Sequence, residues 1–357
     1  MKNSQIIVAL LVSMLSVSVV AKDEKEFGRK NVSILAGPAT MHLMKAVASN
    51  VDAKFLKAET KFEYRNSVAS LQLLCRGQGP GYPDMVAVTR EMNDEEYKEC
   101  QKNNVGSIIK VKIGYEAVVV VADKKSIDLD LNQRELYLAL SKDVPNPENE
   151  GVVMDNFYKT WKDIDANAPK QAIKIFGPAS KTRDARSVSA LAMEGGCRTW
   201  DWIARLESLK ASYRLYRAMC HVQRDDGHYI KAASTDTDLT KKLLANKNSI
   251  GLMSFNDWLK SKSKLKAYPI EELPPTLGTI SKGLYPLSRG LYVYIKAENL
   301  HKVQGLAHVM SELLSKEALG EKGYLAEIGL VAMPAKELKR EVQQAAQFQS
   351  MPKPEES

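Results

Sequence analysis

Residues 172–193 combine, in direct succession, the patterns of a strand, a tight turn and a helix. Residues 172–176 alternate apolar and polar side chains, as a short strand does, and Gly177 and Pro178 end it. Thr182 and Asp184 then offer oxygens that can cap a helix, and apolar residues follow at helical spacing. Units of strand, turn and helix build α/β sheets, so this stretch predicts an α/β fold.

The same turn has the properties of an anion site. A helix N-terminus presents free backbone N–H groups and the positive end of the helix dipole, and both favour a negative ligand. The hydroxyls of Ser180 and Thr182 and the guanidinium of Arg183 are the side-chain donors that an oxyanion needs. The alternative is that these residues only cap the helix, because capping motifs of this kind are common.

The length and composition of the chain predict a folded protein with two lobes. The chain has 357 residues, of which 44% are hydrophobic and 26% charged, which is ordinary for a folded soluble protein. Its net charge of +8 favours anionic partners in general. The basic residues are scattered among acidic ones without interleaved aromatic residues, so we do not expect nucleic acid as a partner.

The first 21 residues have the three parts of a secretory signal peptide. Lys2 supplies the positive charge, residues 6–20 form a short apolar region, and Val19 and Ala21 provide small side chains at the cleavage site. No cysteine follows for a lipid anchor, and no later apolar run reaches the length of a membrane span. The sequence therefore predicts cleavage after Ala21 and a periplasmic or secreted protein.

Four cysteines remain in the exported chain, where disulfides are permitted: Cys75, Cys100, Cys197 and Cys220. Three pairings are possible, and pairing the sequence neighbours would close two modest loops. No CxxC, HExxH or zinc-finger spacing occurs, so we expect neither a metal nor a cofactor. We also expect no enzyme, because the sequence has no GxSxG elbow, no Walker loop and no constellation around its five histidines.

Several motifs resemble the phosphate-binding components of bacterial ABC uptake systems. The segment GPASKTRDAR at 177–186 resembles the second anion loop of that family, G-P…S-G-T-R-D-A-F, and PDMVAVTREM at 83–92 resembles P-D-I…A-S-R-x-M. IGYEAVV at 113–119 and YPLSRGLYVYIK at 285–296 resemble I-G-Y-D-G-I-V and Y-P-L-S-R-P-L-Y-I-Y-V-K. The resemblance extends from about residue 34 to residue 334.

This resemblance implies the type II periplasmic binding protein fold, in which two α/β lobes are joined by two crossing strands and hold the ligand between them. We expect residues 22–115 and 290–340 to form lobe 1, residues 116–289 to form lobe 2, and the polar residues 341–357 to be disordered. The alphaproteobacterial type of the family carries cysteines at matching places. That match supports the pairs Cys75–Cys100 and Cys197–Cys220.

The resemblance also implies a ligand-binding set, which is Thr40, Ser67, Thr89, Arg90, Ser180, Lys181, Thr182 and Arg183. Arg90 has an alternative role in a salt bridge between the lobes. The implied function is capture of phosphate or a related oxyanion by a monomer that delivers it to an ABC transporter permease.

All three anion loops depart from the family pattern. Pro38 and Ala39 interrupt the first, residues 65–68 replace the glycine-rich second, and Lys181 replaces a glycine of the third. The alternative is therefore a degenerate paralogue that binds a different anion or acts as a secreted interaction or signalling protein.

Overall fold

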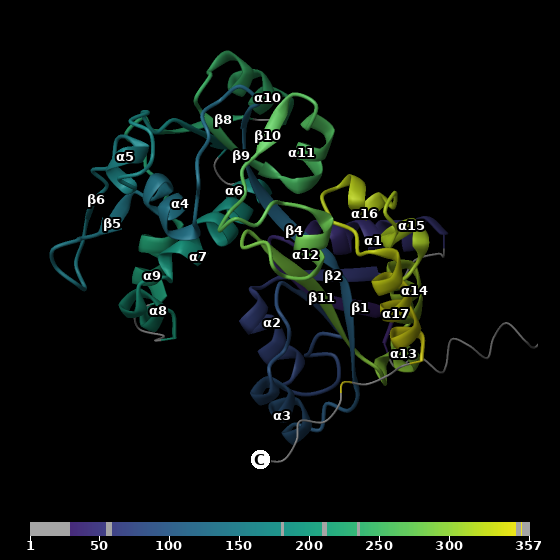
Figure 1. The fold of residues 1–357 in the computed structure, drawn as a ribbon. Helices are drawn as coiled ribbons and strands as arrows, with labels where there is room; N and C mark the ends of the chain where they lie inside the picture. The colour runs from purple at the N-terminus through teal and green to yellow at the C-terminus, as the bar shows by residue number, and fades with distance from the viewer. Residues whose placement is uncertain are drawn as a thin grey trace, which may run out of the picture.

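The computed structural model describes residues 29–54, 59–179, 182–208, 213–233, 236–347 and 351. The signal peptide expected at residues 1–21 lies outside them. The described residues form a mixed α/β structure around a sheet of nine strands in the order β2-β1-β3-β11-β4-β9-β7-β8, with β10 paired to β4 (Figure 1). The α/β class that the sequence predicts is therefore confirmed.

The strands of the main sheet are short apart from the two that cross its middle. Their bounds are β1 Asn31–Ala36, β2 Glu59–Tyr64, β3 Met85–Val88, β4 Ile108–Asp123, β7 Ile175–Pro178, β8 Tyr229–Ala233, β9 Ile250–Ser254, β10 Leu265–Ala267 and β11 Ser288–Lys296. A separate hairpin pairs β5 Asp143–Pro145 with β6 Val153–Asp155.

Helices cover the sheet on both sides of the crossing (Figure 1). The helices before the second half of the sheet are α1 Met41–Lys54, α2 Ser67–Leu74, α3 Asp94–Lys102, α4 Gln133–Leu140 and α5 Trp161–Ile164. Those of the second half are α6 Arg183–Val188, the π-helix η2 Ser189–Met193, α7 Glu194–Cys197, α8 Asp201–Ser208, α9 Tyr213–His221, α10 Asp236–Ala245, α11 Phe255–Ser261 and α12 Leu277–Ser281. The last are α13 Asn299–Lys302, α14 Leu306–Leu313, α15 Lys316–Leu319, α16 Tyr324–Glu327 and α17 Ala335–Ala346.

The strand β4 belongs to both halves of the sheet. Its first part pairs antiparallel with β11, from Ile108 opposite Lys296 to Ala117 opposite Ser288. Its second part, Val118 to Val121, pairs with β9. Both crossing strands that the sequence predicts are therefore present. The lobe boundaries that we expect after residues 115 and 289 stay a prediction.

The crossing is irregular at Gly114. The register of β4 against β11 shifts there, and Gly114 has a φ of +145°, a conformation that side chains disfavour. A Cβ atom at Gly114 would also lie 2.7 Å from the carbonyl oxygen of Val331. The neighbouring Tyr115 exchanges two backbone hydrogen bonds with Val331, each 2.9 Å long. These two hydrogen bonds attach the segment around Val331 directly to β4.

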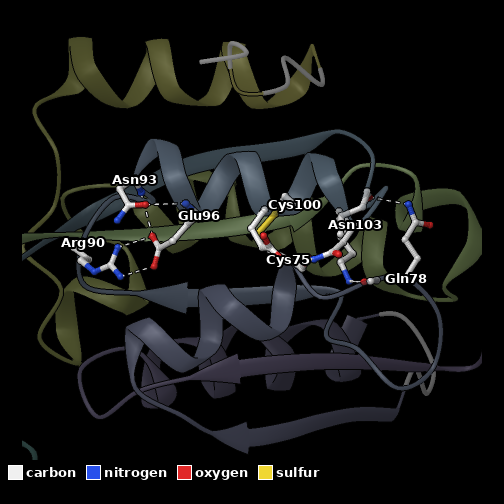
Figure 2. The surroundings of a disulfide bond; sticks show 11 residues. Cys75, Gln78, Arg90, Asn93, Glu96, Cys100 and Asn103 are labelled. Carbon is white, nitrogen blue, oxygen red and sulfur yellow. Dashed lines mark hydrogen bonds and ion pairs between the residues drawn. A yellow bond between two sulfur atoms is a disulfide. The ribbon is translucent and has the colours of Figure 1, made fainter. Parts of the chain in front are cut away.

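Both disulfides of the sequence-neighbour pairing are present, Cys75–Cys100 and Cys197–Cys220. The first joins the end of α2 to α3 (Figure 2). It lies in a small apolar cluster that includes Leu71, Val86 and Tyr97. Among the described residues no cysteine is free. The predicted pairing is therefore confirmed.

The structure contradicts part of the disordered tail expected at residues 341–357. Residues 341–346 belong to α17, where Glu341 and Ala345 are buried. Glu341 accepts a 3.1 Å hydrogen bond from the backbone of Lys112, so the helix packs on β4. The polar composition misled the sequence prediction because a helix buries only one face, and a few suitably spaced residues are enough for that. Among the described residues no helix is both long and apolar enough to cross a bilayer.

Candidate functional site

A wide cleft of about 810 Å³ lies between the two halves of the structure. One wall of the cleft consists of the start of α2 and the residues that follow β3. The other wall consists of η2, α7 and the start of α4, and the start of β11 also lines the cleft. Three residues of the predicted ligand-binding set line this cleft, namely Ser67, Thr89 and Arg90.

Ser67 and Thr89 form one hydrogen-bonded pair in the cleft. The Ser67 hydroxyl accepts a 3.1 Å hydrogen bond from the backbone N–H of Thr89, and the two hydroxyl oxygens lie 3.2 Å apart. Asn66 caps α2 by accepting a 2.8 Å hydrogen bond from the N–H of Ala69. The cap fixes the first turn of α2, so Ser67 is held at the end of β3. The pair presents two hydroxyls at a helix N-terminus, which suits an oxyanion.

Arg90 is half-exposed and is bound on its own wall of the cleft. Its two terminal nitrogens pair with both carboxylate oxygens of Glu96, at 2.8 Å and 2.7 Å, and it also donates to the carbonyl of Glu91 (Figure 2). Glu96 belongs to α3, and it forms a complete capping box there with the N-cap residue Asn93. The salt bridge is therefore within one half of the structure and not between lobes. A ligand at Arg90 would share the guanidinium with Glu96.

A second arginine of the cleft, Arg289, pairs across the crossing strands. Its guanidinium contacts Glu116 of β4 at 2.7 Å and 2.9 Å. The other oxygen of Glu116 accepts a hydrogen bond from the hydroxyl of Ser187 in α6. Through these two contacts Glu116 links α6 to both crossing strands, β4 and β11.

Thr40 lies away from the wide cleft and is fully buried. Its hydroxyl donates a 2.8 Å hydrogen bond to the carbonyl of Ala87 and accepts one of 3.2 Å from the N–H of Gly37. These contacts hold the first βα turn against β3. Both hydrogen-bonding functions of the hydroxyl are used inside the protein.

Thr182 and Arg183 lie at the start of α6. The Thr182 hydroxyl caps the helix by accepting from the N–H of Ala185 at 3.1 Å, and it donates to Ala179 at 2.7 Å. Arg183 donates to the carbonyl of Ile328 and lies 2.9 Å from Nε2 of His42. Ser180 and Lys181 lie outside the described residues.

Arg183, His42 and Ser187 surround a small inner cavity of about 20 Å³. Burial and the nearby Arg183 guanidinium lower the pKa of His42 to about 4, so the imidazole is neutral at neutral pH. The predicted set is thus divided between two places: Arg183 lies at the inner cavity, and Ser67, Thr89 and Arg90 lie in the wide cleft.

Sequence reasoning missed several polar residues of the wide cleft, among them Gln133, Glu194 and Arg198. Glu194 accepts a 2.8 Å hydrogen bond from the Tyr216 hydroxyl. Burial alone would raise its pKa, but His221, Tyr216 and Arg198 lower it below its usual value, so Glu194 is a carboxylate.

A local signal for this wall was present in the two glycines that follow Glu194. A Cβ atom at Gly196 would lie 2.0 Å from the carbonyl oxygen of Gln133, so only glycine allows α7 to pack this closely on α4. That close approach brings Glu194 and Gln133 onto one wall of the cleft.

A family model described as a PBP superfamily domain matches residues 21–317. The phosphate-binding protein PstS of Staphylococcus aureus strain USA300 is 25% identical over 310 residues, covering 82% of this chain and 78% of that protein. The phosphate-binding protein PstS of Staphylococcus haemolyticus strain JCSC1435 is 26% identical over 287 residues, covering 76% and 75%.

Two solved structures share the fold. A possible phosphate binding protein from Planctomyces limnophilus DSM 3776 superposes with a TM-score of 0.66 at 17% identity, covering 90% of this chain and 99% of that one. An ABC-type phosphate transport receptor from Vibrio cholerae gives a TM-score of 0.53 at 16% identity, covering 85% and 100%. The fold is therefore the type II periplasmic binding protein fold, and because the family model matches most of its length, this chain belongs to the PBP superfamily.

Proposed function

We propose that this protein is an exported substrate-binding protein that captures phosphate or a related oxyanion and passes it to the permease of an ABC importer. The observation that carries the proposal is the wide cleft, where the hydroxyls of Ser67 and Thr89 lie beside Arg90, with Arg198 and Arg289 also in the lining. Hydroxyls, a helix N-terminus and guanidinium groups are the donors that bind oxyanions in proteins.

The relatives support the same proposal, since the two staphylococcal proteins are named phosphate-binding proteins and the Vibrio cholerae structure a phosphate transport receptor. The function is capture and release without chemistry. A periplasmic location, a monomeric state and docking to a permease belong to this proposal, as does the ligand-binding set itself.

A second candidate, binding of a different anion on the same fold, is favoured by one specific observation. Thr40, Thr182 and Arg183 use their hydrogen-bonding groups within the protein. Their contacts would have to open before these side chains could bind a ligand. An anion held mainly by the residues of the wide cleft would not require that change.

Isothermal titration of the mature protein with phosphate and with sulfate tests the proposed function. We expect saturable phosphate binding that Ser67→Ala weakens about tenfold, because the variant removes a hydroxyl from the cleft. The matched control is Ser107→Ala, since Ser107 is exposed outside the cleft. Absence of phosphate and sulfate binding by the folded wild type would contradict the proposal, and sulfate binding alone would favour the second candidate.

A further inference from the structure

The inner end of the site is narrow. The cavity beside Arg183 and His42 measures about 20 Å³, enough for about one water molecule but not for a phosphate ion or a larger ligand. Arg183 itself fills this end by reaching the carbonyl of Ile328. The space for a ligand is therefore the wide cleft of about 810 Å³, which lies in the range of pockets for organic molecules.

Polar side chains line one part of the wide cleft, and apolar side chains line another part. Ser67, Thr89 and Arg90 form the polar part described above. Next to Ser67, on the first turn of α2, Val68 lines the same cleft with 48% of its surface exposed. A bare oxyanion gains nothing from an apolar side chain, whereas an organic group that covers Val68 removes apolar surface from water.

The opposite wall adds further apolar surface through the π-helix η2, which inserts into the run from α6 to α7. Both Ala190 and Leu191 line the cleft, but Leu191 is only 6% exposed, so the apolar surface comes from the partly exposed Ala190. Single-turn π-helices inside α-helices are frequent at functional sites, because they change which side chains a helix presents. Both walls therefore carry apolar side chains.

The charges near α7 offset one another. The carboxylate of Glu194 and the guanidinium of Arg198 both line the cleft and interact electrostatically. This part of the lining therefore offers no net positive charge to a second anionic group, while a neutral group or a hydroxyl is acceptable there. A ligand that is anionic at one end and uncharged at the other matches both parts of the lining.

We propose that the ligand is a phosphate monoester whose phosphoryl group binds at Ser67 and Thr89 and whose uncharged organic group covers Val68 and Ala190. The inference rests on the proposed function, because it names the ligand class of the same cleft. It assigns Val68 as a residue that determines specificity.

The test is isothermal titration of the mature protein with phenyl phosphate, inorganic phosphate and phenol. We expect phenyl phosphate to bind at least about tenfold more tightly than inorganic phosphate, and phenol not to bind measurably. Val68→Ala should weaken phenyl phosphate binding about threefold to tenfold and leave inorganic phosphate unchanged, since only apolar surface is lost. Val152→Ala is the matched control, because Val152 is 42% exposed and lies outside the cleft.

Three results would overturn the proposal. If inorganic phosphate binds as tightly as phenyl phosphate or more tightly, the ligand is the bare ion and the proposed function still stands. If phenyl phosphate binds more tightly but Val68→Ala has no more effect than Val152→Ala, the organic group does not lie where we place it. If the folded protein binds neither compound, this inference and the proposed function both fail.

Discussion

Arg183 Nη1 lies 2.9 Å from Nε2 of His42. This contact joins the start of α6, in one half of the structure, to α1, in the other half. Arg183 also donates to the carbonyl of Ile328, 145 residues further along the chain. The start of α6 is therefore held by side-chain and backbone atoms of the protein itself. These contacts connect the two halves of the structure at the inner end of the cleft.

The first prediction concerns the pH dependence of this contact. The pKa of His42 is about 4 in the folded protein and about 6.5 in an unfolded chain. The unfolded state therefore binds more protons between these values, so stability rises with pH through this window. The contribution is fully present above about pH 6.5 and is lost as pH falls toward 4. It amounts to at most about 3 kcal/mol.

Urea unfolding at several pH values checks this prediction, with Arg183, Glu116 and Asp184 as the charged groups nearest to His42. His42→Gln should flatten the stability curve between pH 4 and pH 6.5, since the variant cannot titrate. The matched control is His301→Gln at an exposed position. A wild-type curve as flat as that of His42→Gln would show that the imidazole is not buried in its neutral form.

The fold could be predicted well from the sequence because its signals are local. The strand, turn and helix at residues 172–193 depend on neighbours within a few positions, and the structure confirms that a strand and a helix are present. The strand spans Ile175–Pro178 and so includes Gly177 and Pro178, which were expected to end it after residue 176. The disulfide pairs were implied by the family resemblance, which favoured the pairing of sequence neighbours. The helix α17 was missed in part, because the few buried positions of an amphipathic helix are hidden in a polar composition.

The site was harder to predict because its contacts are distant in sequence. The contact of Arg183 with Ile328 depends on how two halves of the chain pack, which no local pattern encodes. The positions of Glu194 and Arg198 in the cleft depend on the π-helix that precedes them, and helical spacing alone would place them differently. Ser67 and Thr89, which follow an N-cap and a strand end, were predicted and do lie together.

A second prediction concerns the disulfide between Cys75 and Cys100. It closes a loop with a sequence separation of 25 and ties α2 to α3 within the smaller apolar cluster. Replacing both cysteines by alanine should lower the free energy of unfolding by about 3 kcal/mol. Urea unfolding of the purified variant measures this. Peptide mapping of the non-reduced wild type that finds free thiols, or cross-pairing with Cys197 or Cys220, would contradict the structure.

A third prediction concerns Tyr115, which lies on the crossing strand beside Gly114. Its hydroxyl donates to a carboxylate oxygen of Glu337 in α17 at 2.6 Å, and the carbonyl oxygen of Ser281 in α12 lies 3.0 Å from the same hydroxyl. Tyr115→Phe should lower the free energy of unfolding by about 1–2 kcal/mol, since it leaves a half-buried carboxylate without this partner. The comparison is Tyr64→Phe at a position 52% exposed, and equal effects of the two variants would refute a role at the crossing.

The last prediction separates two roles of Arg90, ligand binding and support of α3. Both terminal nitrogens of Arg90 are bound to Glu96, so the carboxylate offsets the charge that an anion would meet. Glu96→Gln removes this negative charge but keeps the capping box of α3, because glutamine can replace glutamate at that helix position. If Arg90 binds the ligand, Glu96→Gln should raise phosphate affinity about threefold to tenfold, and Arg90→Ala should lower it about tenfold.

Isothermal titration of the two variants measures both effects. The matched control is Glu135→Gln, which removes the glutamate from the same position of the capping box of α4, outside the wide cleft. An effect of Glu96→Gln that exceeds this control assigns the change to Arg90 and not to net charge. If Arg90 only supports α3, Glu96→Gln and Arg90→Ala should both lower the free energy of unfolding and leave phosphate affinity unchanged. That result would remove Arg90 from the ligand-binding set.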